Sequence, residues 1–81
     1  MPDKNPILIQ VGLNIRRLRL SVGLSQEGLA LKSGLDRSYV GGVERGERNV
    51  SVVNLCKLAD AIGEPPTSLL VGIEPANPSV Q

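Results

Sequence analysis

The sequence predicts an all-α fold, a compact bundle of five short helices in one small domain. Its 81 residues suffice for a single domain with a modest core. The chain has one Tyr and no Phe or Trp, so the core has to be aliphatic, which suits short packed helices. Aliphatic residues also recur every three or four positions between glycines and prolines. This spacing is typical of amphipathic helices that end at those breakers.

The first predicted helix starts at Asn5 and Pro6, because Asn is a favoured N-cap and Pro is favoured at the first helical position. Gly23 is expected to end it in a left-handed conformation. Arg19 falls on the apolar side of this helix, where a charge needs a buried partner or a path to solvent. The apolar stripe consists of Leu8, Val11, Ile15, Leu18 and Val22.

The second and third predicted helices are short and close together. Ser25 caps the second helix and Gly34 ends it, whereas Asp36 caps a third helix over residues 37–45 that Gly46 closes. Because so few residues connect them, the two helices are expected to cross steeply.

The fourth predicted helix begins after Ser51 and ends at Gly63, and Pro65-Pro66 then starts a short fifth helix. The apolar side of the fourth helix carries Val52, Leu55, Leu58, Ala59 and Ile62. The predicted organisation is a lead-in at 1–6, a folded domain at 7–73 and a disordered tail at 74–81.

The composition excludes several classes of function. With no His and one Cys, an ordinary zinc, haem or Cys–His catalytic site is not expected, and an internal disulfide is impossible, which fits a reducing cytoplasm. The N-terminus has no long apolar run, so neither a signal peptide nor a membrane span is expected. No nucleophile–base set or phosphate-binding glycine motif is present, so neither an enzyme nor a cofactor is expected. Cys56 is expected to be a partly buried, small apolar residue.

The third predicted helix has an unusual outward face. On a helical wheel Val40 and Val43 point inward, Glu44 lies at the edge of that sector and Tyr39 lies at the flank. The chain has a net charge of only +1, but residues 16–48 hold seven basic and four acidic side chains. Such a strip fits either a phosphate-facing surface or an ordinary solvated face. The outward face itself carries Arg37, Ser38, Gly41, Gly42 and Arg45. Its glycines predict a bare stretch that a partner can approach closely.

The stretch "SQEGLALKSGLDRSYVGGVERGERNVS" resembles the helix-turn-helix of the lambda-repressor/Cro type, the XRE-like family. The matching pattern runs from Gln26 to Arg45, with small Ala30 between the two helices and Gly34 in the turn. The similarity extends upstream through "VGLNIRRLRLSVGLSQ" and downstream through "NLCKLADAIG". Within the family, "LDRSYVGGVERGERNVS" is most similar to the controller proteins of restriction–modification systems.

The resemblance implies a transcription regulator that binds a palindromic operator in double-stranded DNA, with no small-molecule ligand. Residues expected to contact bases in the major groove are Arg37, Ser38 and Gly42. Those expected to contact the DNA backbone are Gln26, Tyr39, Arg45, Arg48 and Asn49. Many relatives carry a long polar side chain where this chain has Gly42, which indicates backbone or shape recognition at that position.

The resemblance also implies a structural ion pair between Arg19 and Glu44, which agrees with the inward positions of both on the helical wheels. Members of the family commonly dimerise through the last helix. A homodimer is therefore expected, with an interface formed by Leu69, Leu70, Val71 and Ile73.

Two other functions stay open on this fold. One is a phage-type repressor or an antitoxin, which a longer C-terminal partner-binding region would favour. The other is a protein-bridging module that has lost DNA affinity. Loss of Gln26, Arg37 or Arg48 would favour that module, and all three are present.

Overall fold

The computed structural model describes residues 5–74, so most of the predicted tail lies outside the described residues. The described chain forms α1 (Pro6–Ser21), α2 (Gln26–Ser33), α3 (Arg37–Glu44), α4 (Val52–Ile62) and the 3-10 helix η1 (Pro66–Leu70). The prediction of an all-α fold is confirmed, but the count of five α-helices is wrong. The fifth element is a 3-10 helix of five residues, bounded by extended backbone at Pro65 and at Val71.

The helix ends lie where the capping residues predict them. The Asn5 side chain accepts a hydrogen bond from the backbone N–H of Ile7 at 2.8 Å, and Ser25 accepts one from Gly28 at 2.9 Å. Asp36 and Ser51 cap α3 and α4 in the same way. The predicted terminating glycines all have positive φ angles between 75° and 90°: Gly23, Gly34, Gly46 and Gly63.

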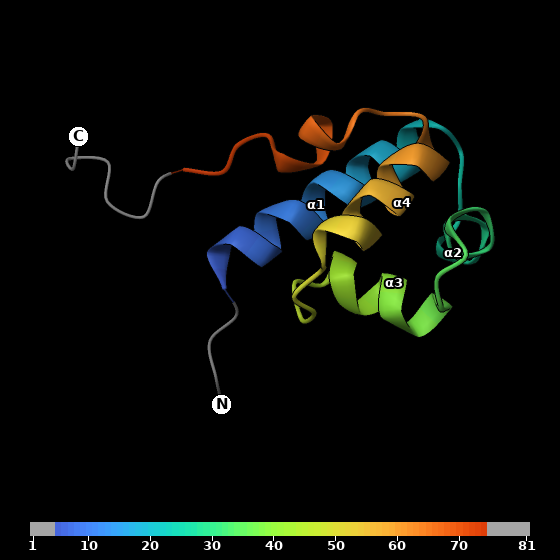
Figure 1. Ribbon diagram of the computed structural model, residues 1–81, viewed down its shortest axis with the longest axis horizontal. Helices are drawn as coiled ribbons and strands as arrows, with labels where there is room; N and C mark the ends of the chain where they lie inside the picture. The colour runs from blue at the N-terminus through green and yellow to red at the C-terminus, as the bar shows by residue number, and fades with distance from the viewer. Residues whose placement is uncertain (1–4, 75–81) are drawn as a thin grey trace.

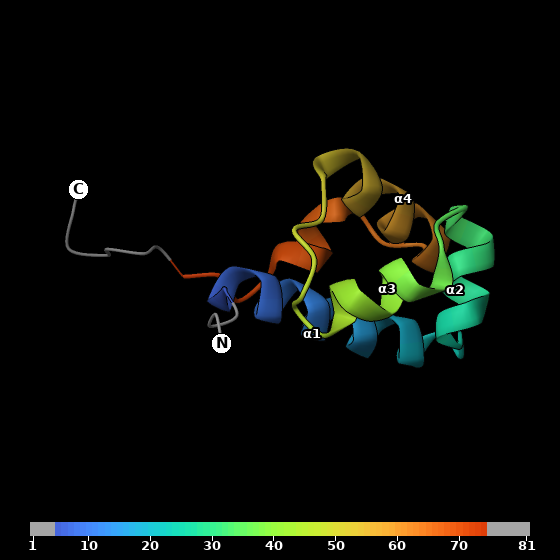
Figure 2. The same ribbon diagram turned by 90° about the horizontal axis from the view of Figure 1, so that it is seen from below.

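The helices pack around one aliphatic core. Figure 1 shows α1 and α4 side by side, with η1 packed against both, and Figure 2 shows α3 along α1. Helix α2 packs on α3 and α4 at one end of the molecule. The start of α1 and the last described residues lie at the opposite end. The largest fully buried side chains are Ile15, Leu29, Leu58, Leu69, Val40 and Val43.

Three expectations about burial are wrong. The predicted apolar stripes include Val22 and Val52, but 50% of Val22 and 76% of Val52 is exposed. Both lie at helix ends, since Val22 follows the last turn of α1 and Val52 is the first residue of α4. Cys56, expected to be partly buried, is exposed on α4. No helix within residues 5–74 has both the length and the apolar character to cross a membrane.

Candidate nucleic-acid interface

The N-terminus of α3 presents two exposed side chains, Arg37 and Ser38, beside the Asp36 cap. Asp36 Oδ2 accepts a hydrogen bond from the backbone N–H of Ser38 at 3.0 Å and another from the Ser38 hydroxyl. These bonds from Ser38, with a smaller contribution from the charge of Arg48, hold the pKa of Asp36 below its ordinary value of 3.8. The cap is therefore ionised at neutral pH, where its negative charge also stabilises the helix dipole.

The two glycines of α3 are buried beneath arginine side chains. An atom at the Cβ position of Gly42 would lie 2.8 Å from Arg48 Cγ, and one at Gly41 would lie 3.1 Å from Arg45 Nη1. The prediction of a bare outward face is therefore wrong, because arginines that follow the helix fold back over it. Gly42 is consequently buried in the free protein, with the Arg48 side chain over the position expected to contact a base. The helical wheel missed this cover because Arg48 lies beyond the turn that ends the helix.

The other residues expected at the DNA backbone lie around α3. Arg48 and Asn49 are exposed in the loop after it, and Arg45 Nε donates to Glu47 Oε1 at 3.0 Å. Tyr39 is half-buried against the core, and its hydroxyl oxygen accepts a hydrogen bond from Asn54 Nδ2 at 3.1 Å. Asn54 was not singled out in the sequence, since no local signal joins α4 to α3.

Arg19 and Glu44 form a buried ion pair that joins α1 to α3. Arg19 Nε donates to Glu44 Oε2 at 2.6 Å and Nη2 donates to Oε1 at 3.0 Å, so the carboxylate is held by both arms of the guanidinium. Only 7% of the Arg19 side chain and 2% of the Glu44 side chain is exposed. Arg19 Nη1 also donates to the carbonyl oxygen of Leu24 at 2.7 Å, which ties the turn before α2 to α1.

Gln26 is attached to the same pair. Its Nε2 donates to Glu44 Oε1 at 3.0 Å, so the first residue of α2 is fixed against the end of α3. The Gln26 amide oxygen lies near Gly41 on the outer side of α3, at 3.6 Å from the Cβ position of that glycine. One buried carboxylate therefore orients both helices of the helix-turn-helix and holds the Gln26 amide at their junction.

The C-terminal apolar residues divide between core and surface. Leu69 is fully buried in the core of the protomer, so its assignment to a dimer interface is wrong. The hydrophobic pattern could not separate a residue that packs inward from one left for a partner. Leu70 is 43% exposed and Val71 is 49% exposed, whereas Ile73 is partly buried against the core.

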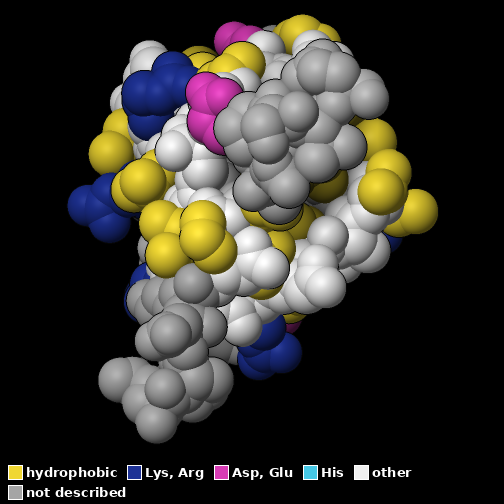
Figure 3. Space-filling view, turned by 90° about the vertical axis from the view of Figure 1, so that its left-hand side faces the viewer, with side chains coloured by type: hydrophobic (Ala, Val, Ile, Leu, Met, Phe, Trp, Pro, Cys, Tyr) yellow, Lys and Arg dark blue, Asp and Glu magenta, His cyan; other side chains and the backbone are white. Residues whose placement is uncertain are grey.

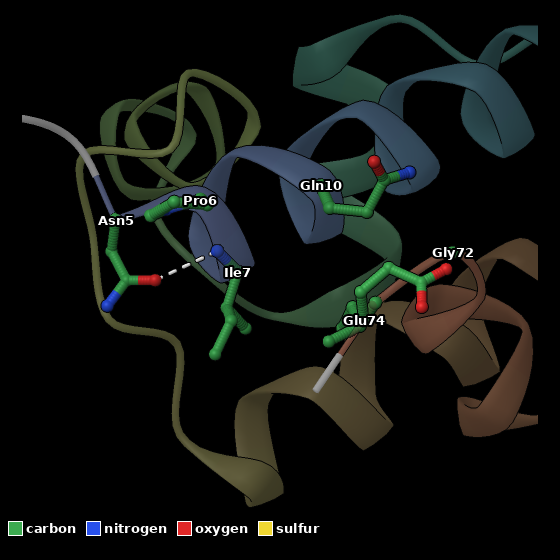
Figure 4. Close-up of a pocket in the computed structure, with 7 residues that line it drawn as sticks. Asn5, Pro6, Ile7, Gln10, Gly72 and Glu74 are labelled. Atoms are coloured by element: carbon green, nitrogen blue, oxygen red, sulfur yellow. Dashed lines mark hydrogen bonds between the residues drawn. The ribbon is translucent and has the colours of Figure 1, made fainter. Parts of the chain in front are cut away.

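A polar contact holds this C-terminal segment to α1. Asn14 is 3% exposed, and its Nδ2 donates to the carbonyl oxygens of Leu69 at 3.0 Å and Val71 at 2.8 Å. Gln10 Nε2 in turn donates to Asn14 Oδ1 at 3.1 Å. Figure 3 faces the end of the molecule where α1 begins and shows several groups of apolar side chains there. A pocket at this end, drawn in Figure 4, is lined by Asn5, Pro6, Ile7, Gln10, Gly72, Ile73 and Glu74.

Comparison with known proteins identifies the family. A helix-turn-helix family model matches residues 15–69, which covers the ion pair and all of α2, α3 and α4. The control protein C.SmaI of Serratia marcescens is 49% identical over 74 residues, spanning 86% of this chain and 88% of that protein. The chain belongs to the helix-turn-helix family and, within it, to the restriction–modification controller proteins.

Solved structures of controller proteins share this fold. The crystal structure of the controller protein C.AhdI from Aeromonas hydrophila has a TM-score of 0.75 and 61% identity, covering 76% of this chain and 94% of that one. The controller protein C.Esp1396I, solved as a tetramer in complex with its natural 35-base-pair operator, has a TM-score of 0.75 and 34% identity. That match covers 80% of this chain and 86% of that protein.

Proposed function

We propose that this protein is a sequence-specific transcription regulator that binds a palindromic operator as a homodimer, as the controller of a restriction–modification system. The observation that carries the proposal is the way α3 is held in the fold. Its outer face carries Arg37 and Ser38, and its inner face is fixed to α1 and α2 by the buried Arg19–Glu44 pair. The proposed function involves no catalysed reaction and no cofactor.

In this proposal α3 enters the major groove with its N-terminus toward the bases. Arg37 is the principal base contact, because the fork of a guanidinium matches the O6 and N7 acceptors of guanine. Ser38 is the second base contact. Its hydroxyl donates to Asp36 in the free protein, which leaves the hydroxyl oxygen able to accept from a base amino group. Both side chains are exposed in the free protein, so neither needs to leave a buried site to reach DNA.

The proposed backbone contacts surround that helix. Glu44 uses one N–H of the Gln26 amide, and the second N–H can donate to a phosphate oxygen. The Tyr39 hydroxyl accepts from Asn54, which leaves its own O–H to donate to a phosphate. The remaining contacts to phosphates are proposed for Arg45, Arg48 and Asn49.

The proposed dimer uses the exposed apolar residues that follow η1. Leu70 and Val71 form its centre, and the partly buried Ile73 lies at its edge. A two-fold dimer presents two copies of α3 to half-sites about 34 Å apart, which explains a palindromic operator. C.Esp1396I, which was solved as a tetramer on its operator, supports this kind of assembly on DNA.

The test is selection of binding sites from randomised duplexes by the wild-type protein and by Arg37→Ala. Wild type is expected to enrich a two-fold motif, and Arg37→Ala should lose preference at one base pair in each half-site, at a cost of about 1–3 kcal/mol. The matched control is Arg17→Ala, which removes the same charge from an exposed position on α1. It should lower affinity weakly and leave the motif unchanged.

Two results would contradict the proposal. If no motif is enriched and both proteins bind all duplexes equally weakly, α3 does not recognise DNA and the protein-bridging function gains support. If a motif is enriched but Arg37→Ala retains every base preference, recognition lies on another surface. Varying the salt concentration separates these cases, since phosphate contacts alone give a steep salt dependence without sequence preference.

A further inference from the structure

Gly42 lies on the outer side of α3 directly beneath the stem of Arg48. An atom at its Cβ position would be 2.8 Å from Arg48 Cγ, 3.3 Å from Nε and 3.6 Å from Cδ. Three consecutive atoms of the arginine side chain therefore cross this glycine. Real Cβ atoms do not approach a neighbour as closely as 2.8 Å, so any side chain at position 42 would displace Arg48.

Gly41 provides a contrast within the same helix. Its Cβ position lies 3.1 Å from Arg45 Nη1, which is the flexible end of a long side chain, and 3.6 Å from Gln26 Oε1. A methyl group there requires only a small shift of that end, whereas at Gly42 the obstructed atom is Cγ, close to the backbone of residue 48. A methyl group therefore fits at Gly41 with a small side-chain shift, whereas at Gly42 it requires the Arg48 stem to move.

Two observations indicate the path of the Arg48 side chain besides its contact with Gly42. Its backbone follows the turn at the end of α3, where Glu47 N–H donates to the carbonyl oxygen of Gly42 at 2.9 Å. Its charged end lies close enough to the N-terminus of α3 to contribute to the lowered pKa of Asp36, after the larger effect of the hydrogen bonds from Ser38. The arginine thus extends from the end of α3 back toward the face that carries Arg37 and Ser38.

We propose that Gly42 is a positioning residue for DNA recognition, because the space above it lets the Arg48 side chain cross α3 and join Arg37 and Ser38 on the DNA-facing surface. The inference rests on the proposed function, since it assumes that this surface meets DNA. In this inference, the DNA contact expected at position 42 is made by the Arg48 side chain, which belongs to the loop after α3. Glycine at this position costs helix stability relative to alanine, but an alanine methyl group would obstruct the path of that side chain across α3.

The experiment is a cycle of four proteins, wild type, Gly42→Ala, Arg48→Ala and the double variant, with Gly41→Ala as the matched control. Operator affinity is measured at one salt concentration and thermal unfolding is measured beside it. Gly42→Ala is expected to stay folded, because the helix propensity of alanine offsets the displacement of the exposed Arg48 side chain, yet to bind DNA about tenfold more weakly. Gly41→Ala should bind within about twofold of wild type. In the Arg48→Ala background Gly42→Ala should cause no further loss.

Two binding results would overturn the inference. The first is Gly42→Ala binding as tightly as wild type. The second is an equal loss with and without Arg48, which means that the new methyl group obstructs DNA itself. A measurement without DNA keeps the inference separate from the proposed function. Nuclear Overhauser contacts between Gly42 Hα and the Arg48 side chain are expected in the free protein. Their absence refutes the arrangement, whereas failure of wild type to bind any duplex refutes only the DNA-binding function.

Discussion

At the scale of single residues, the Asp36 cap links the stability of α3 to pH. Its pKa is lowered in the folded protein, chiefly by the side-chain and backbone hydrogen bonds from Ser38. A carboxylate whose pKa falls on folding stabilises the native state fully above its unfolded pKa, here about 3.8, and this stabilisation is lost as the pH falls through the lowered folded value. The start of α3 should therefore loosen only in strong acid.

Ser38→Ala is expected to raise the pKa of Asp36 toward its ordinary value, because it removes the hydroxyl that donates to the carboxylate. The measurement is a carbon NMR titration of the Asp36 carboxyl in both proteins. Arg48→Ala serves as a comparison and should raise this pKa by less, since the charge of Arg48 lowers it less than the hydrogen bonds from Ser38 do. An unchanged Asp36 pKa in Ser38→Ala would show that the cap does not depend on the hydroxyl.

The buried pair of Arg19 and Glu44 gives a prediction about stability. Glu44→Ala leaves the Arg19 guanidinium buried without its carboxylate, so unfolding in urea should show a loss of about 3–5 kcal/mol. Glu47→Ala is the matched control, because it removes a carboxylate from an arginine pair on the surface and should cost at most about 1 kcal/mol. Equal losses in the two variants would mean that the buried pair does not clamp α1 to α3.

At the scale of elements, α1 and α3 approach one another with backbone against backbone. An atom at the Cβ position of Gly12 would lie 2.4 Å from the carbonyl oxygen of Glu44 and 2.5 Å from that of Val43. Gly46, just after α3, lies against the backbone of Ile9, with the Ile9 Cα at 3.0 Å from its Cβ position. The two glycines, one in each segment, bring α3 close enough for Arg19 to reach Glu44.

Gly12→Ala is expected to destabilise the fold by about 1–3 kcal/mol or more, because its methyl group meets carbonyl oxygens that cannot rotate away. Denaturant unfolding measures this loss. Gly41→Ala should be neutral or stabilising, because its methyl group meets only the ends of the flexible Arg45 and Gln26 side chains. If Gly12→Ala is as stable as Gly41→Ala, the close approach of α1 and α3 is not a constraint on the fold.

The sequence predicted most of the elements because helix ends are set by local chemistry. Caps such as Ser25 and Asp36, and glycines such as Gly34, act within a few residues of their position. Prediction from the sequence failed where the burial of a residue depends on packing against distant parts of the chain. Arg48 covers Gly42 only because of the path of the loop after α3. Leu69 and Leu70 are adjacent residues of the same type. Only the packing of η1 on α1 and α4 decides which of the two is buried.

At the scale of the whole molecule, Asn14 connects the core to the proposed dimer surface. By binding the carbonyl oxygens on either side of Leu70, it fixes the backbone that carries Leu70 and Val71. Leu69 points into the core from the same short segment and anchors it from inside. An ordered backbone lowers the entropic cost of forming an interface, so a small apolar surface can support a dimer.

Leu70→Glu is expected to yield a folded monomer, because a carboxylate on this exposed surface cannot be desolvated in a two-fold interface at little cost. Analytical ultracentrifugation gives the oligomeric state and thermal unfolding reports the fold. Leu69→Ala is the comparison, and it should cost about 2–5 kcal/mol of stability because this neighbouring leucine is buried.

DNA binding separates dimerisation from recognition in the same variant. A monomer keeps α3 intact, so Leu70→Glu should bind an isolated half-site with the affinity that wild type shows for it. On the full palindrome it should lose the advantage that wild type gains from two joined recognition helices. If Leu70→Glu instead remains a dimer and binds the palindrome as wild type does, the two-fold contact lies elsewhere on the protomer. The exposed Leu13 and Leu20 of α1 would then be the next surface to test.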